Sequence, residues 1–153
     1  MSGDARGSLP FGIESSVLGE EFEVAVSEPV TREEILEYSA SVGEPPQVAD
    51  DDVLAPPTFC ICFRGNRFFH PSIPTEVFLR GFDAGKDIAF GAPIRVGDVI
   101  TGRNVLHDLY EKTGRSGTMT FIVSRNTLTN QRDEMVAVID SRFVVRSEAK
   151  PDE

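Results

Sequence analysis

The sequence predicts an α+β domain in which a curved antiparallel sheet wraps around one short, very apolar helix. From about residue 87 onward, apolar side chains recur with a period of two, which is typical of strands. A well-capped helix precedes that region, and between the two lies "FCICF", a run that is apolar on every side. A helix that is apolar all round belongs at the centre of a structure.

The first half of the chain supplies one strand and one helix. "EFEVAVS", residues 21–27, alternates apolar with polar or small residues and predicts a strand. In "VTREEILEYSASVG", Thr31 and Glu34 have the spacing of a capping box. Gly43 stands where a left-handed helix cap belongs. We therefore predict a helix over residues 32–42.

The stretch "APPTFCICF" is compatible with a buried strand or a buried helix. Pro56 and Pro57 favour the helix, because proline suits the first helical turn. We predict a short central helix with Phe59–Phe63 buried against the concave face of the sheet.

The second half predicts an antiparallel meander of long strands. A turn at Gly97 and Asp98 leads into the first long strand. "KTGRSG" joins two strands and lacks the order of a phosphate-binding loop, so it predicts a hairpin. The expected strands cover residues 87–94, 99–110, 118–126 and 135–146.

Length and composition predict a single domain over residues 13–146, flanked by flexible tails at 1–12 and 147–153. The chain has 153 residues and a net charge of -10, which argues against nucleic acid or an anionic membrane as the main partner. No apolar run approaches the ~20 residues of a membrane span. The N-terminus lacks a signal-peptide pattern, so we expect a cytoplasmic protein.

Nothing in the sequence predicts a metal site. Cys60 and Cys62 form a C-x-C, which is neither a redox spacing nor half of a zinc site, and small buried thiols are expected. His70 and His107 have no metal-type partner at helical spacing. The aspartates 50–52 lack the glycine and glutamate of an EF-hand, so a solvated turn is expected.

The order of elements resembles a hot-dog fold, and several stretches resemble its MaoC-like hydratase/dehydratase family, in particular the MaoC-like dehydratase N-terminal branch. These stretches include "TREEILEYSASVG", "LAPPTFCICF", "PIRVGDVITGRNV" and "YEKTGRSGTMTFIVSRNTLTNQRDE". With the closing strand they span about residues 20–146. The "APPTF" helix start and the P-x-R-x-G-D strand entry are specific only in combination.

Catalytic members of the family share a loop of the form Y-x-x-x-V-G-D-x-N-P-L-H. Its aspartate and histidine activate a water that adds across an enoyl thioester, or they catalyse the reverse reaction. Tyr38, Val42 and Gly43 match this loop. However, Glu44 stands at the aspartate position and Ala49 at the histidine position, so the resemblance implies that no complete catalytic dyad is present.

The family includes heterodimeric enzymes in which only one hot-dog subunit carries the dyad. Examples are hydroxyacyl dehydratases of mycolic-acid elongation and enoyl-CoA hydratases of steroid side-chain breakdown. This chain resembles the subunit without the dyad. The resemblance thus implies a dyad-bearing hot-dog partner, a fatty-acyl or steroid side-chain thioester of CoA or an acyl carrier as substrate, and no metal or redox cofactor.

Two sets of residues are candidates for binding that substrate. In the family, the start of the central helix polarises the thioester carbonyl, which implicates Pro57, Thr58 and Phe59. Phe63 of the same helix is a further candidate for substrate binding. Backbone N–H groups at a helix start are unpaired and carry partial positive charge. Arginine suits phosphate groups, and the candidate CoA or carrier contacts are Arg64, Arg67, Arg80 and Lys86.

Two other functions stay open at this point. The chain could be a homodimeric hydratase that uses Glu44 with an unusual base. It could also be an acyl-thioester-binding or scaffold protein with no lyase role. Activity of the purified chain alone on a trans-enoyl-CoA separates the first of these from a dyad-lacking subunit.

Overall fold

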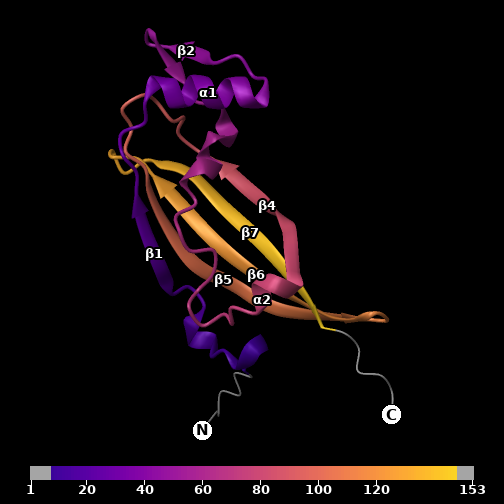
Figure 1. Cartoon of the computed structure of the whole chain (residues 1–153). Coiled ribbons are helices and arrows are strands. Elements are labelled where there is room, and N and C mark those ends of the chain that lie inside the picture. Colours follow the sequence, from indigo (N-terminus) through magenta and orange to yellow (C-terminus); the bar gives the residue numbers. More distant parts are fainter. Residues whose placement is uncertain (1–7, 148–153) are drawn as a thin grey trace, which may run out of the picture.

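The computed structural model describes residues 8–147, and its centre is a curved five-stranded antiparallel sheet with strand order β1-β5-β6-β7-β4 (Figure 1). The fold class predicted from the sequence is confirmed. Helix α1 and a small hairpin lie at one end of the sheet, and two short N-terminal turns lie at the other. The strands are β1 (Glu21–Val26), β4 (Gly81–Phe90), β5 (Thr101–Gly114), β6 (Gly117–Thr129) and β7 (Met135–Ser147).

The meander from β5 to β7 follows the sequence pattern, with one irregularity that the pattern hides. Leu106 and Leu109 are both buried although they are three residues apart, because the register of β5 shifts between Leu106 and Asp108. A bulge of this kind changes which face the following side chains point to. In the sequence, His107 is spaced by two from Val105 and Leu109, but the bulge breaks this alternation and His107 lies exposed.

Helix α1 (Arg32–Val42) has the predicted bounds. The Thr31 side chain accepts a hydrogen bond from the Glu34 N–H, and the Glu34 carboxylate accepts one from the Thr31 N–H, so the capping box is complete. Ile35 is fully buried in the main core cluster. Gly43 has a φ of 73°, which permits the left-handed end of the helix.

The predicted central helix is η3 (Pro57–Phe63), a 3₁₀ helix of 7 residues. Phe59 and Cys60 are buried, but Ile61 and Cys62 are exposed, so burial on every side is wrong. In a 3₁₀ helix, side chains three apart lie in line. Cys60 and the partly buried Phe63 share one such line and Phe59 lies next to it, whereas Ile61 and Cys62 are exposed.

Strand β4 begins six residues before the predicted start at residue 87 and ends at Phe90. Its first part was hidden by an irregularity between Asp83 and Lys86, where Gly85 has a φ of 103°. The Asp83 side chain accepts a hydrogen bond from the Gly85 N–H at 2.8 Å and stabilises this kink.

A second core cluster lies at the end of the sheet against which the N-terminal turns pack. Leu106 and Ile122 belong to it, with Val77 from the short helix α2 (Val77–Arg80) in the connection that precedes β4. The tail expected over residues 1–12 lies partly outside the described residues. Its described part is not a free tail, because Leu9 packs against this cluster beside η1 (Pro10–Gly12) and η2 (Ser15–Val17). The predicted C-terminal tail lies outside the described residues except for Ser147.

Within residues 8–147, no helix is long and apolar enough to cross a membrane.

Candidate functional site

The segment after α1, which resembles the catalytic loop of the MaoC-like family, leads into a β-hairpin. Glu44 directly follows the helix cap, its N–H bonds to the Ser39 carbonyl at 3.0 Å, and the residue is exposed. Two prolines lead into β2 (Gln47–Ala49), which pairs with β3 (Asp52–Leu54). The sequence analysis did not predict these strands, because three-residue strands carry almost no periodicity.

The aspartate run forms the turn of this hairpin. Asp50 and Asp51 have φ values of 52° and 62°, which is the backbone of a tight two-residue hairpin turn. Asp50 pairs with Arg95 at 3.4 Å, and Asp52 with Arg32 at 3.2 Å. The turn is thus solvated and held by ion pairs. Among the described residues, no group of His, Cys, Asp or Glu is arranged to hold a metal ion.

Neither histidine of the chain lies beside Glu44 or Ala49. His70 is buried, its Nδ1 accepts the Ser72 N–H at 3.1 Å, and its Nε2 is 3.6 Å from a Glu20 carboxylate oxygen. Glu20 precedes β1, whereas α1 and the hairpin follow the opposite end of that strand. The Glu44 carboxylate therefore has no imidazole near it.

The start of η3 is fixed against α1. The Tyr38 hydroxyl donates to Thr58 Oγ1 at 2.9 Å, and the Tyr38 ring stands edge-on to Phe59, with centroids 5.3 Å apart. The expected set of free N–H groups at this helix start is largely wrong. Pro57 has no N–H, and the Phe59 N–H bonds to the Pro56 carbonyl at 2.9 Å. Only the Thr58 N–H makes no hydrogen bond to the described residues.

Phe59 and Phe63 line an open groove of about 510 Å³ along α1, together with Tyr38. Glu28, Glu34 and Glu37 also line this groove. Its negative charge opposes the phosphates of CoA. Pro57 lies elsewhere, at a small apolar cavity of about 130 Å³. The four candidate residues of η3, which are Pro57, Thr58, Phe59 and Phe63, therefore do not line one common pocket.

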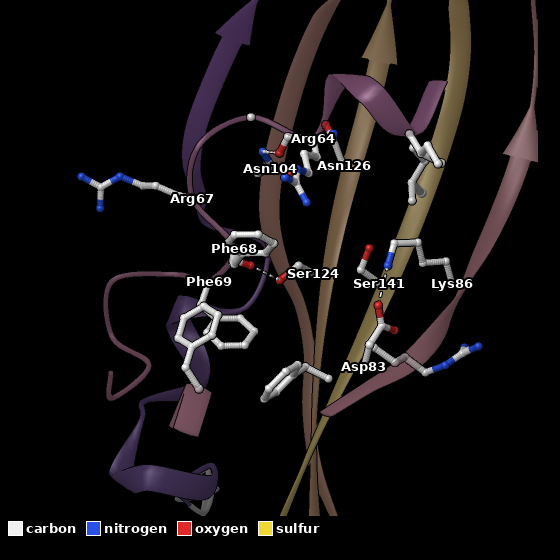
Figure 2. A pocket seen from close by; sticks show the side chains of 16 residues that line it. Arg64, Arg67, Phe68, Phe69, Asp83, Lys86, Asn104, Ser124, Asn126 and Ser141 are labelled. Atoms are coloured by element: carbon white, nitrogen blue, oxygen red, sulfur yellow. Dashed lines mark hydrogen bonds and ion pairs between the residues drawn. The ribbon is translucent and has the colours of Figure 1, made fainter. Parts of the chain in front are cut away.

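A second pocket, here called the concave-face cavity, lies between the sheet and the connection from Arg64 to Arg80 (Figure 2). It has a volume of about 350 Å³. Three of the four predicted cationic contacts, Arg64, Arg67 and Lys86, line it, and Arg80 does not. An aromatic group of Phe68, Phe69, Phe78 and Phe143 lines it as well.

The aromatic group is packed ring against ring. The Phe69 and Phe78 centroids are 4.3 Å apart, and Phe143 approaches Phe69 edge-on at 5.1 Å. The Arg64 guanidinium lies over the Phe68 ring at 5.1 Å. Cation and ring contacts of this kind hold a flexible arginine in place. Figure 2 shows Arg64 over the cavity, whereas Arg67 extends away from it.

Lys86 reaches the cavity from the edge strand β4. Its ammonium donates to Asp83 at 2.9 Å, and this hydrogen bond, with the one from the Gly85 N–H, holds the pKa of the Asp83 carboxyl below its ordinary value. Asp83 is therefore ionised at neutral pH. The cavity is thus lined by three arginines, Arg64, Arg67 and Arg142, and by Lys86. Of these, only Lys86 is paired with a carboxylate of the lining, whereas Arg142 is paired with Asp87 outside it.

Two asparagines at one end of the cavity were missed by the sequence analysis. Asn104 and Asn126 lie opposite each other on β5 and β6. The Asn126 side chain donates to the Phe63 carbonyl at 2.9 Å, and that of Asn104 donates to the Arg64 carbonyl at 3.3 Å. They satisfy carbonyls at the end of η3, which a helix leaves unpaired. Asparagine is uncommon in strands, so an asparagine at an inward-facing position of a predicted strand is the sequence signal that could have identified them.

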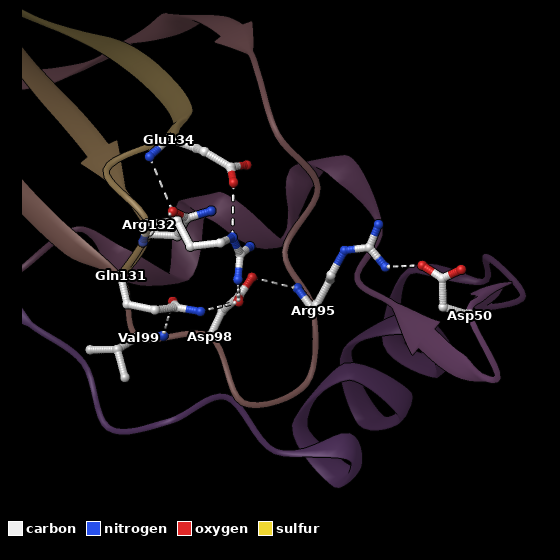
Figure 3. A network of polar contacts seen from close by, with 8 residues as sticks. Asp50, Arg95, Asp98, Val99, Gln131, Arg132 and Glu134 are labelled. Atoms are coloured by element: carbon white, nitrogen blue, oxygen red, sulfur yellow. Dashed lines mark hydrogen bonds and ion pairs between the residues drawn. The ribbon is translucent and has the colours of Figure 1, made fainter.

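The conspicuous P-x-R-x-G-D stretch has a structural role (Figure 3). Asp98 is buried and accepts the Arg95 N–H at 2.9 Å and the Gln131 side-chain amide at 2.8 Å. Arg132 adds an ion pair at 3.3 Å. The carboxylate therefore joins the turn before β5 to the turn between β6 and β7.

The fold places the chain among hot-dog proteins. A subunit of the ChsH1-ChsH2 complex from Mycobacterium tuberculosis superposes with a TM-score of 0.65 at 15% identity, covering 86% of each chain. The MaoC-like dehydratase from Rhodospirillum rubrum gives 0.64 at 16% identity, with 94% of this chain and 100% of that one covered. A subunit of the HadBC (3R-hydroxyacyl-ACP dehydratase) complex from M. tuberculosis gives 0.55 at 18%, covering 83% and 99%.

The sequence narrows this class to one family. The model of the FAS1-like dehydratase domain region matches residues 16–139. The chain belongs to this family of MaoC-like hot-dog dehydratases. It is also 24% identical over 151 residues to a UPF0336 protein from Thermobifida fusca (strain YX), covering 90% of this chain and 96% of that protein.

Proposed function

We propose that this chain is the dyad-lacking, acyl-holding subunit of a heteromeric hydratase or dehydratase that acts on fatty-acyl or steroid side-chain thioesters. One observation carries the proposal. The segment in the position of the catalytic loop is a hairpin with Glu44 exposed and Ala49 within β2, whereas the concave-face cavity has both apolar walls and cations. The chain thus has the features of a binding subunit without those of a proton-transfer site.

The concave-face cavity suits an acyl thioester in shape and charge. Its volume of about 350 Å³ is in the range of small-molecule sites. The aromatic group offers apolar contact to an acyl chain. Arg64 and Arg67 are exposed and lie where they can bind phosphates of CoA or of a carrier-bound pantetheine, because guanidinium groups bind phosphate through two parallel hydrogen bonds.

The edge strand β4 is the surface proposed for the partner. The opposite edge, β1, is six residues long and carries Glu21 and Glu23, which discourages pairing. Each edge has one irregularity, between Glu21 and Glu23 in β1 and between Asp83 and Lys86 in β4. Strand β4 has ten residues, and Phe82 and Phe90 on it are 56% and 51% exposed. Because β4 also supplies Lys86 to the cavity, a partner on this edge would extend the sheet and close the cavity from the side.

The reaction itself needs a carboxylate and an imidazole, which the partner would supply. During hydration, water gives its hydroxyl to one carbon of the enoyl double bond and a proton returns to the other, and dehydration is the reverse. In this account the present chain holds the acyl group while the partner's aspartate and histidine move the protons.

Co-expression with a hot-dog protein from the same locus that carries an intact G-D-x-N-P-x-H loop tests the proposal. A stable mixed complex with hydratase activity is expected, and substitution of the partner's aspartate or histidine should abolish that activity. Phe82→Lys on the β4 edge should weaken the complex, whereas Val24→Lys on the β1 edge should not. Failure to form any mixed complex would overturn the proposal.

A further inference from the structure

The floor of the concave-face cavity carries a polar row between the two apolar core clusters. Ser124 on β6 lies opposite Ser141 on β7, and Ser141 lies opposite Lys86 on β4. All three line the cavity, and Figure 2 shows them together on its floor. Ile139 of the first cluster and Ile122 of the second lie on either side of this row.

The hydrogen-bonding capacity of the row is only partly used. The Ser124 hydroxyl donates to the Phe68 carbonyl at 3.3 Å, which leaves its oxygen free to accept. The Ser141 hydroxyl makes no hydrogen bond to the described residues. Lys86 uses one of its three donors on Asp83, which leaves two. The row therefore presents donors from Ser141 and Lys86 and an acceptor from Ser124.

A plain hydrocarbon chain is a poor match for this floor. It would remove water from the Ser141 hydroxyl and the Lys86 ammonium without replacing the lost hydrogen bonds, which is costly. An oxygen on the ligand would restore them. A ketone or carboxylate oxygen would accept from Ser141 or Lys86, and a hydroxyl could in addition donate to Ser124.

We infer that the cavity selects acyl thioesters whose acyl group carries an oxygen function beyond C3, where the acyl chain crosses the row of Ser124, Ser141 and Lys86. This inference rests on the proposed function, because it assumes that the acyl group lies in the concave-face cavity. The thioester carbonyl oxygen and the amide oxygens of pantetheine are other sources of the same chemistry, and both are also present in octanoyl-CoA. Arg64, which reaches over the cavity from the connection, favours placing the phosphate end near the connection and the acyl end on the floor.

Isothermal titration calorimetry of the full-length chain tests the inference with three probes: octanoyl-CoA, a set of oxo-octanoyl-CoA isomers with the ketone beyond C3, and CoA alone. At least one oxo isomer should bind about three- to tenfold more tightly than octanoyl-CoA, because this is the affinity gain expected from one net hydrogen bond. Ser141→Ala should remove that preference and leave the affinity for CoA alone unchanged. Ser116→Ala, in the β5–β6 turn, is the matched control and should retain it.

The outcomes separate the inference from the function beneath it. Equal binding of octanoyl-CoA and every oxo isomer would overturn the inference and leave the proposed function standing. If CoA alone binds more weakly to Ser141→Ala than to the wild type, the row binds the pantetheine part of CoA. That result would also overturn the inference. Binding of neither thioester would contradict the proposed function itself. If thermal melting shows that Ser141→Ala does not fold, two other measurements decide the question. These are the preference of the wild type for an oxo isomer over octanoyl-CoA and the loss of that preference in Ser124→Ala.

Discussion

The Tyr38 hydroxyl donates a hydrogen bond to Thr58 Oγ1 at 2.9 Å and so joins α1 to the start of η3. Tyr38 belongs to the stretch that resembles the family's catalytic loop, and Thr58 to the helix start that this resemblance implicates in thioester binding. The contact therefore holds the stretch that contains Glu44 next to the start of η3.

Phe59 should be the main anchor of η3. It is 5% exposed, so Phe59→Ala should lower the free energy of unfolding by about 3–5 kcal/mol. Ile61, two residues further along the same helix, is 39% exposed, and Ile61→Ala should cost about 1 kcal/mol or less. Urea denaturation of both variants measures the difference, and equal losses would contradict the orientation of η3.

The cations of the concave-face cavity should differ in their effect on thioester binding. Arg64→Ala should weaken CoA binding by roughly ten- to a hundredfold, because this is the affinity change expected from losing hydrogen bonds to a charged group. Arg80→Ala should change it little, because Arg80 does not line the cavity. Calorimetry at low and high salt measures both. The same loss in the two variants would indicate a general charge effect instead of a site.

Stability should decrease at acidic pH through identifiable carboxyls. The hydrogen bond from Arg125 holds the pKa of the Asp140 carboxyl below its ordinary value, and Arg142 has the same effect on the pKa of Asp87. A folded-state pKa below the unfolded value gives stability that is full above about pH 4 and is lost as pH falls through the folded pKa.

Asp140→Asn removes one of these titrations. Its melting temperature should therefore change less between neutral pH and about pH 3 than that of the wild type. Identical acid profiles for the two proteins would show that the Arg125–Asp140 pair does not contribute.

Glu44 should contribute little to catalysis in the assembled complex. Because no imidazole lies beside it, Glu44→Gln should lower kcat by less than about tenfold, whereas a general acid or base contributes about 100- to 10,000-fold. A steady-state hydration assay of the complex distinguishes these ranges. A loss in the larger range with the fold intact would favour an enzyme that uses Glu44 with an unusual base.

The elements with strong local signals were predictable. The capping box of Thr31 and Glu34 and the left-handed Gly43 set α1 to the residue, because each acts within one helical turn. The long strands followed from their period of two. What failed depends on tertiary contacts: the open side of η3 and the bulge at His107 are set by packing against the sheet.

The candidate site was predictable only in part. Arginines near η3 could be named from the sequence, but which of them face a common cavity depends on the path of the connection to β4. The polar row of Ser124, Ser141 and Lys86 arises from the pairing register of three strands. A single strand pattern does not contain that information.

Hydration of a trans-enoyl-CoA by the purified chain, measured beside its mixed complex with the dyad-bearing partner, tests the central claim most directly. The account predicts no activity above background for the chain alone and full activity for the complex. Hydration by the chain alone at the rate of the complex would contradict it.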